Sequence, residues 1–276
     1  ITGLNPNTAY DFYVESCCNP GQWEGPFTFQ TECTGPLAAG TYSVGPTGDF
    51  ATMDSVLSTL NVCGIAGAVT FELQSGSFTG GTIGAVNGVS ATNTITFSGA
   101  TAANDTLGAL VLNGTSYINL EDLYIRTTGG FAVRLNGTDN VTIDGCTIET
   151  SSAVSTQNIV IVASASATSY STVTEGETNL TISNNTLKGG YFSMAFYGSS
   201  ANLDGYSDIT VTGNTITGAY YYGMYFYYGR NIHIEGNTIG NFTNTYNYAA
   251  YLYNIDGCVF TKNHVDSYYS VLAYYL

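Results

Sequence analysis

The sequence is poor in basic residues and in charge of either sign. Lys and Arg together number 5 against 20 Asp and Glu, which gives a formal net charge of −15, and only 9% of the 276 residues are charged. Nucleic acids and anionic membrane surfaces attract proteins through clustered Lys and Arg. The composition therefore argues against both as partners. No apolar run reaches the length of a transmembrane helix, so we expect no membrane span.

Helical patterns are almost absent, and a repeated strand pattern takes their place. Each copy has apolar residues at its first, third and eighth positions, with Thr, Ser, Asn or acidic residues between them. The copies start at Val69, Ile95, Ile118, Val141, Leu180, Ile209, Ile232 and Cys258, at intervals of 23 to 39 residues. A period of this size, with one short strand and a Gly-Asn turn per copy, is typical of coils stacked into a solenoid.

A second alternating segment follows most of the later copies. These segments are Phe131–Leu135, Phe192–Phe196, Tyr222–Phe226, Tyr248–Leu252 and Tyr269–Ala273. Each coil therefore has at least two strands joined by tight turns. The predicted fold is all-β, a parallel β-helix of about eight coils. We expect one interior column at the first repeat position, made by Ile95, Ile118, Val141, Leu180, Ile209, Ile232 and Cys258.

The sixth repeat position carries Asn in four coils, at Asn185, Asn214, Asn237 and Asn263. Stacked coils place equivalent residues about 4.8 Å apart. Side-chain amides in such a column can bond to the next coil and satisfy turn groups that would otherwise be buried unpaired. We interpret these residues as a structural ladder rather than as binding residues.

One segment, Gly48–Gly64, has the spacing of an amphipathic helix. Its apolar residues are Phe50, Met53, Val56, Leu57 and Leu60. Asp49 or Thr47 can cap its start, and Gly64 can end it. Such a helix would cover the open edge of the first coil and block further strand addition. The last residue, Leu276, falls inside a strand copy, so we expect the solenoid to be truncated at its C-terminus.

The six cysteines lack the spacing of a metal site and are Cys17, Cys18, Cys33, Cys63, Cys146 and Cys258. Cys146 and Cys258 occupy different repeat positions, which suggests small buried residues. A disulfide between Cys33 and Cys63 would tie the first segment to the predicted helix. Cys17 or Cys18 could instead pair with Cys33. Either pairing requires an oxidising compartment.

The first 33 residues follow a different pattern. They carry a Leu-x-Pro-x-Thr-x-Tyr corner, made by Leu4, Pro6, Thr8 and Tyr10. This corner and the strand-like runs after it resemble the last two strands of a fibronectin type III domain. The resemblance divides the chain into fibronectin-like strands over 1–33, a linker and cap with a helix over 34–68, and coils over 69–276.

This order of segments resembles secreted surface proteins of Bacteroidota-type bacteria, which carry right-handed parallel β-helices of the pectate-lyase-like superfold. The resemblance implies a right-handed solenoid and a secreted or cell-surface location. It implies fold better than activity, because that superfold hosts lyases, hydrolases, adhesins and passive stalks.

A catalytic cluster of the kind such enzymes use is hard to find. A lyase needs a basic residue beside grouped Asp residues, but the basic residues here are scattered at Arg126, Arg134, Lys188, Arg230 and Lys262. At the fourth repeat position, Glu121 and Asp144 should be outward neighbours. Repulsion between their carboxylates would raise the pKa of one of them, or the pair would bind a cation such as Ca²⁺. Arg134 could share their surroundings. The alternative is that both carboxylates are simply solvated. We expect no enzyme activity, and no cofactor other than such a Ca²⁺ ion.

The second strand suggests a surface rich in tyrosine. If Phe192, Met194 and Phe196 point inward, an outward column contains Tyr197, Tyr227, Tyr253 and Tyr274. The next outward column contains Tyr225 and Tyr251. We expect these six side chains to be substantially exposed, and aromatic rows of this kind stack on sugar rings. A register shift of one residue would bury them instead. Ser/Thr-rich insertions at Ser151–Gln157 and Ala163–Thr178 read as surface loops.

The sequence therefore predicts a secreted, non-catalytic β-helix module that binds carbohydrate or mediates adhesion through its tyrosines. Its partner would be a glycan surface or other copies of itself. Two alternatives remain open. One is a polysaccharide lyase or glycoside hydrolase using Glu121 and Asp144, and the other is a structural stalk or filament subunit with the tyrosines as its interface.

Overall fold

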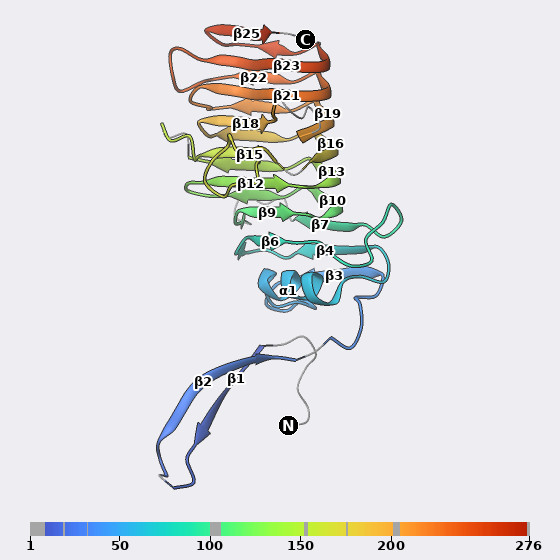
Figure 1. Cartoon of the computed structure of the whole chain (residues 1–276), viewed down its shortest axis with the longest axis vertical. Coiled ribbons are helices and arrows are strands. Elements are labelled where there is room, and N and C mark those ends of the chain that lie inside the picture. The colour runs from blue at the N-terminus through green and yellow to red at the C-terminus, as the bar shows by residue number, and fades with distance from the viewer. Residues whose placement is uncertain are drawn as a thin grey trace.

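The computed structural model describes residues 9–18, 20–31, 33–99, 106–151, 154–174, 176–200 and 205–274. From Gly40 onward these residues wind into a solenoid with three walls, each a parallel β-sheet, and a two-stranded hairpin lies below its N-terminal end (Figure 1). The coils stack in sequence order along one axis, so residues one repeat apart become neighbours.

The first two walls, sheets I and II, are joined. Sheet I is formed by β3 (Gly40–Val44), β4 (Val69–Leu73), β7 (Ile95–Gly99), β10 (Ser116–Glu121), β13 (Asp139–Asp144), β16 (Glu177–Ser183), β19 (Tyr206–Thr212) and the second halves of β21 (Tyr222–Glu235) and β23 (Tyr248–Thr261). Sheet II is formed by β6 (Gly81–Ile83), β9 (Leu110–Asn113), β12 (Phe131–Asn136), β15 (Ile159–Ala163), β18 (Phe192–Tyr197), the first halves of β21 and β23, and β25 (Tyr269–Tyr274). Because β21 and β23 run unbroken from sheet II into sheet I, the two walls share one hydrogen-bonded network.

The third wall, sheet III, has short strands. They are β5 (Ser77–Phe78), β8 (Thr106–Leu107), β11 (Tyr124–Arg126), β14 (Thr147–Thr150), β17 (Thr186–Gly189), β20 (Thr215–Thr217), β22 (Thr238–Gly240) and β24 (His264–Val265). Each coil therefore runs from sheet I through sheet III to sheet II. The eighth repeat position, which the sequence marks as apolar, supplies the inward residue of sheet III.

Strand registers confirm the interior column predicted at the first repeat position. Consecutive pairings join Ile95, Ile118, Val141, Leu180, Ile209, Ile232 and Cys258. All but Cys258 are at most 1% exposed. Aromatic residues stack in the same way, with the ring centroids of Phe71 and Phe97 5.2 Å apart and those of Phe196 and Phe226 5.1 Å apart. Each fully buried side chain of this size contributes about 1.5–3 kcal/mol.

The corner leading into sheet I depends on left-handed backbone conformation. The residue before the first repeat position has φ between 52° and 57° in five successive coils, at Tyr117, Asn140, Asn179, Asp208 and Asn231. Asn and Asp adopt this conformation more readily than other residues with a Cβ atom. In the next coil Gly257 takes the position with φ 80°. This corner leaves a row of polar side chains on the outside of the solenoid.

The turn between sheets I and III contains the predicted asparagine ladder. The backbone N–H and side-chain amide of Asn185 donate to Asn214 Oδ1 at 2.9 and 3.0 Å, and Asn214 and Asn237 repeat both bonds to the next coil. The Asn185 amide also donates to the Ile143 carbonyl at 2.8 Å. Cys146 occupies the same position one coil earlier and donates its N–H to Asn185 Oδ1 at 2.8 Å. The ladder satisfies backbone groups that the buried turn would otherwise leave unpaired.

Helix α1 (Met53–Cys63) covers the N-terminal end of the solenoid, as the sequence indicates. Met53, Val56, Leu57 and Leu60 face the core, and Gly64 ends the helix with φ 70°. The cap residue is Thr52 rather than the expected Asp49 or Thr47, because its hydroxyl accepts from Ser55 N at 3.2 Å. Asp49 instead accepts from the N–H and hydroxyl of Ser43, both at 2.8 Å.

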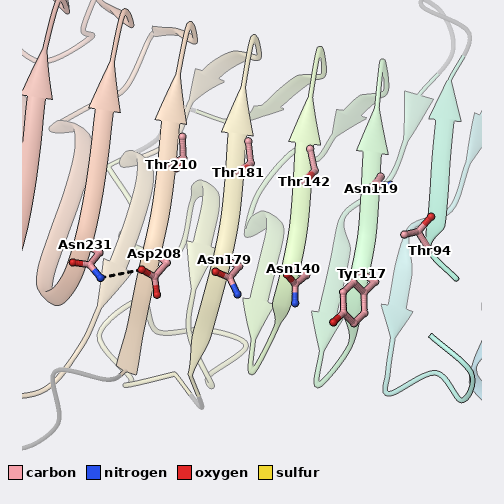
Figure 2. Close-up of a pocket in the computed structure, with 10 residues that line it drawn as sticks. All are labelled: Thr94, Tyr117, Asn119, Asn140, Thr142, Asn179, Thr181, Asp208, Thr210 and Asn231. Atoms are coloured by element: carbon pink, nitrogen blue, oxygen red, sulfur yellow. Dashed lines mark hydrogen bonds between the residues drawn. The ribbon is translucent and has the colours of Figure 1, made fainter. Parts of the chain in front are cut away.

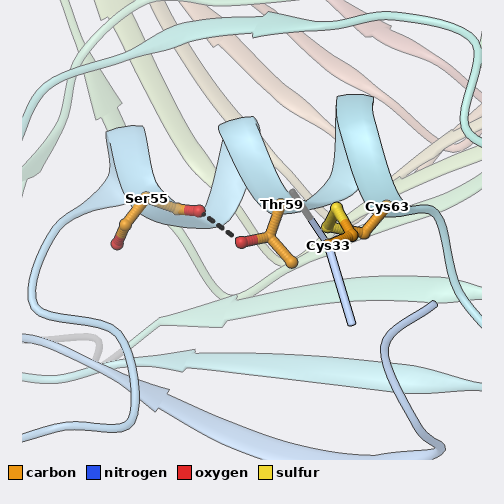
Figure 3. Close-up of a disulfide and its surroundings, with 4 residues drawn as sticks. All are labelled: Cys33, Ser55, Thr59 and Cys63. Carbon is orange, nitrogen blue, oxygen red and sulfur yellow. Dashed lines mark hydrogen bonds between the residues drawn. A yellow bond between two sulfur atoms is a disulfide. The ribbon is translucent and has the colours of Figure 1, made fainter. Parts of the chain in front are cut away.

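The docking of α1 blocks the edge of sheet II directly. The Asn61 amide donates to the Thr82 carbonyl at 3.0 Å and accepts from Gly84 N at 2.8 Å, so it replaces the next strand at the edge of β6. Sheet I is covered differently, because β3, inside the segment predicted as linker and cap, pairs with β4. Cys33 and Cys63 form a disulfide with Cα atoms 5.6 Å apart at the end of α1 (Figure 3).

The N-terminal hairpin forms a sheet of its own. β1 (Ala9–Glu15) pairs antiparallel with β2 (Trp23–Gln30), and Tyr10 lies opposite Phe29. Cys17 and Cys18 lie exposed at its tip with their sulfur atoms 3.8 Å apart, and neither joins a disulfide. Leu4, Pro6 and Thr8 of the fibronectin-like corner lie outside the described residues, as does Leu276.

Candidate functional site

The two carboxylates predicted as neighbours on sheet I do lie on adjacent strands. Glu121 in β10 is paired with Asp144 in β13. Asp144 Oδ1 accepts from the Ser183 hydroxyl at 2.6 Å and from the Asn184 amide at 2.8 Å. Neutral donors of the next coil therefore hold this carboxylate. Within the described ranges, no three His, Cys, Asp or Glu side chains come together as a metal site.

Arg134 does not belong to that pair, contrary to expectation. It lies on the outer face of sheet II, where its guanidinium donates to the carbonyls of Ser164 and Ala165 at 3.1 and 3.4 Å. The reason is its position in β12, in a different wall from β10 and β13. Arg134 therefore anchors the insertion that follows β15. Arg126 is paired with Glu149 at 2.7 Å, and Lys262 with Glu235 at 2.5 Å.

Tyrosines stack in columns on the outer face of sheet II. Tyr197, Tyr227, Tyr253 and Tyr274 are in register, and Tyr225 is in register with Tyr251. A third column, which the sequence reasoning missed, contains Tyr222, Tyr248 and Tyr269. We call these nine residues the tyrosine face.

The missed column has a simple structural cause. Two consecutive residues are buried near the start of β12, β15, β18, β21 and β23, as with Ala249 and Ala250, which are both fully buried. The residue before such a pair is turned outward, so Tyr222 and Phe192 lie outside rather than inside. Phe192, predicted inward, packs in an outer cluster with Ile159 and Tyr225. A small residue at the second position of the strand, such as Gly223, is the sequence signal that could have revealed the outward orientation of the first residue.

The tyrosine rings cover one another, so the face is less exposed than expected. Ring centroids of Tyr197 and Tyr227 are 4.8 Å apart, those of Tyr227 and Tyr253 are 4.9 Å apart, and each pair is within 15° of parallel. Tyr225 and Tyr251 stack at 5.1 Å and 7°. Of the six residues predicted to be exposed, only Tyr274 is strongly so, at 48%. Within the columns the ring faces stack on one another.

Five phenols of this face have raised pKa values, so they are protonated at neutral pH. Burial, followed by the neighbouring phenols Tyr228 and Tyr197, raises the pKa of Tyr227 to about 12. Burial also raises the pKa of Tyr222, Tyr225, Tyr248 and Tyr251 above the usual value for tyrosine. A protonated phenol can both donate and accept a hydrogen bond. The face is therefore an apolar surface carrying rows of neutral hydrogen-bonding groups.

The insertion after β15, which was predicted to be a surface loop, covers part of this face. The Tyr170 ring meets Phe192 edge-on at 4.9 Å, Tyr225 at 5.7 Å and Tyr197 at 6.4 Å. Behind the loop, Thr174 donates its hydroxyl to Glu177 Oε1 at 2.5 Å. Glu175, in the same loop, lies outside the described residues.

Glu177 falls in the Ala163–Thr178 segment that was predicted to be a surface loop, but it begins β16 (Glu177–Ser183) and its carboxyl group is buried. Its side chain is 0% exposed, and Oε1 also accepts from Gly137 N at 2.7 Å. Oε2 has no hydrogen-bond partner among the described residues. Burial is the main cause that raises the pKa of Glu177 to about 7, and the hydrogen bonds oppose it. The residue fixes the base of the loop that carries Tyr170.

Comparison with known families agrees with this architecture. The model of the family described as "Right handed beta helix region" matches residues 108–275, which is more than half of the chain. The chain belongs to the right-handed β-helix family. No curated protein matches the sequence. Within the described residues of this β-helix protein, no helix has the length and apolar character to cross a membrane.

Several solved structures are similar to this chain at low sequence identity. The surface adhesin PfbA of Streptococcus pneumoniae is 14% identical, with a TM-score of 0.55, over 85% of this β-helix chain and 66% of the adhesin chain. The pectate lyase Bsp165PelA from Bacillus sp. N165 is 13% identical, with a TM-score of 0.46, over 83% of each chain. An alginate lyase from Paenibacillus sp. str. FPU-7 is 13% identical, with a TM-score of 0.37, over 87% of this chain and 98% of the lyase. This β-helix chain thus spans slightly less than two thirds of the adhesin chain.

Proposed function

We propose that this chain is an extracellular β-helix module that binds carbohydrate, and so mediates adhesion, through its tyrosine face. The observation that carries the proposal is the set of three in-register tyrosine columns on one wall of the solenoid. In the column of Tyr225 and Tyr251, the equivalent outward positions of earlier coils hold Val111, Arg134 and Val162, so the fold does not require tyrosine there. The tyrosines are therefore best explained by what they contact outside the solenoid.

The chemistry of the face fits a polyhydroxylated partner. Tyrosine hydroxyls recur about every 4.8 Å along the axis. Each presents a donor and an acceptor above an apolar ring edge, which suits the mixed hydroxyl and C–H surface of a sugar chain. Stacking also holds the rings in place before binding, so little side-chain entropy is lost on contact. We therefore favour recognition through hydroxyls and ring edges over stacking of sugars on ring faces.

The two alternatives have less support. A lyase or hydrolase would need the carboxylate of Asp144 to be available, but Ser183 and Asn184 hold it. A stalk or filament would bury the tyrosine face in another copy. Tyrosine is common in protein interfaces as well, so self-association has to be measured alongside glycan binding. The S. pneumoniae adhesin with the same fold is compatible with a surface role.

Hydroxyl removal tests the proposal without disturbing the stacks. Glycan-array binding should identify a ligand for the chain. The double variant Tyr227→Phe/Tyr253→Phe should then bind it about fivefold more weakly for each lost hydrogen bond, and thermal unfolding verifies that the variant is folded. Tyr13→Phe, on the exposed part of the hairpin, is the matched control. Unchanged glycan affinity, together with loss of a dimer in light scattering, would favour an assembly surface instead.

A further inference from the structure

A second candidate site lies on a different wall, along the outer face of sheet I. A groove of about 660 Å³ crosses several successive coils there (Figure 2). One row of its lining residues is Asn140, Asn179, Asp208 and Asn231, all at the left-handed corner. A parallel row contains Asn119, Thr142, Thr181 and Thr210, one residue after the inward first position. Tyr117 extends the corner row towards the N-terminal end, and Thr94 lies one strand beyond it (Figure 2).

The amides of the corner row are held in fixed orientations. Asn231 Nδ2 donates to Asp208 Oδ1 at 2.9 Å, and Asn140 Nδ2 and Asn179 Nδ2 donate to the two oxygens of Asp139 at 2.6 and 3.2 Å. Each amide has four hydrogen-bonding positions, so the bond to the neighbouring carboxylate leaves others facing the groove. Outward threonine hydroxyls lie across from them. The groove is therefore lined with preoriented neutral donors and acceptors.

Charge limits which sugars fit. Asp208 lines the groove and Asp139 flanks it, and no Lys or Arg is among the lining residues. The whole chain carries a formal net charge of −15. A polymer of uronic acids would meet like charge without a basic partner, which is unfavourable. Neutral sugars meet no such repulsion, and carboxylates and amides are strong partners for their hydroxyls.

The spacing between successive coils matches the spacing between successive sugars in an extended glycan. Equivalent groups in successive coils lie about 4.8 Å apart. This is close to the advance of one pyranose ring in an extended glycan, so each coil can offer the same donor and acceptor pair to successive sugars. We propose that the sheet I groove binds an extended, neutral polysaccharide lying parallel to the solenoid axis. This site is separate from the tyrosine face, and either can exist without the other.

Two pairs of substitutions test the groove. Thr142→Val/Thr181→Val removes two hydroxyls and keeps the β-branched shape suited to a strand. Asn140→Gly/Asn179→Gly removes two amides, and Gly accepts the φ of 53–54° at both positions. Matched controls are Thr215→Val on sheet III and Asn184→Gly, a left-handed position with φ 55° outside the groove. Thermal unfolding verifies that each variant is folded.

Hexamers of β-1,4-linked glucose, mannose and xylose serve as neutral probes, and hexagalacturonate serves as the anionic comparison. Titration calorimetry should detect binding of at least one neutral hexamer and none of hexagalacturonate. Each groove variant should weaken that binding about 25-fold, which is about fivefold for each of the two lost hydrogen bonds. The two controls should bind as the parent chain does.

Three results would overturn the groove proposal. They are no binding of any neutral hexamer, equal affinity in the parent and in both folded groove variants, or preferential binding of hexagalacturonate. If hexamer affinity falls only in Tyr227→Phe/Tyr253→Phe, the groove is wrong while the tyrosine face keeps its role. If only the groove variants lose binding, the groove stands and the tyrosine face loses its support as a site for these sugars.

Discussion

Glu177 should make the stability of the solenoid depend on pH in a predictable direction. Burial raises its pKa from about 4.5 to about 7 in the folded chain. A carboxyl group with a raised folded pKa favours folding most when it is protonated. Its contribution is therefore fully present below about pH 4.5, declines as pH rises, and is lost above pH 7. The difference of about 2.5 units corresponds to a loss on the order of 3 kcal/mol.

The assay is urea unfolding of the whole chain between pH 4.5 and 8. We expect the free energy of unfolding to fall by about this amount across the range. Glu177→Gln should remove most of the slope, because the amide keeps an acceptor for Gly137 N and Thr174 but carries no charge. Its new NH₂ group, placed where Oε2 has no described partner, would cost about 1–3 kcal/mol. At pH 8 the variant should therefore match or exceed the parent chain.

Glu72→Gln provides the control, since Glu72 is an exposed carboxylate on the same wall. It should leave the pH slope intact. The pKa values of Asp49 and Glu235 are lowered by their hydrogen-bond donors. These two groups therefore lose their contributions to the free energy of unfolding only at lower pH, and they do not affect its slope above pH 4.5. An identical slope in parent and Glu177→Gln would show that Glu177 is ionised in the folded chain at little cost. The account of its burial would then be wrong.

Two further predictions concern the ends and the turns of the solenoid. Replacing Cys33 and Cys63 by Ser should lower the free energy of unfolding by about 3 kcal/mol, because the bond closes a loop between residues 30 apart. Reduction of the parent chain should match the double variant in urea unfolding, and equal stability before and after reduction would count against a structural role. Asn214→Leu should cost about 2–4 kcal/mol, since it removes bonds to Ile182 O and to Asn237 and leaves Asn185 N–H unpaired. Asn244→Leu, in a loop outside the ladder, is its control, and hydrogen exchange at Asn185 should rise only in the ladder variant.

The solenoid and its interior columns could be predicted from sequence because each coil repeats the same local chemistry. Alternation between Ile209 and Val211 fixes the inward face, and the turn asparagines fix the stacking distance. The two consecutive inward residues of sheet II break strict alternation. For this reason Phe192 was assigned to the wrong side and the column of Tyr222 was missed.

The candidate sites were less predictable than the fold, because they depend on contacts between residues that are distant in the sequence. Tyr170 covers Tyr225 from an insertion whose path no periodic pattern specifies. The tyrosine rings shield one another, which a list of outward positions cannot reveal. The sheet I groove joins residues one coil apart at a corner that reads, in sequence, as ordinary turn-forming Asn and Asp.

The disulfide at the end of α1 has a mechanical consequence. Tension applied through the N-terminal hairpin reaches Cys33 and crosses directly to Cys63, so the backbone between them carries no load. Strand β3 and helix α1 both lie inside this bypassed loop. Pulling therefore acts first on the chain just before β4, while the segment that covers the end of the solenoid stays unloaded. A solenoid whose coils are held by bonds parallel to its axis would otherwise peel from that end one coil at a time.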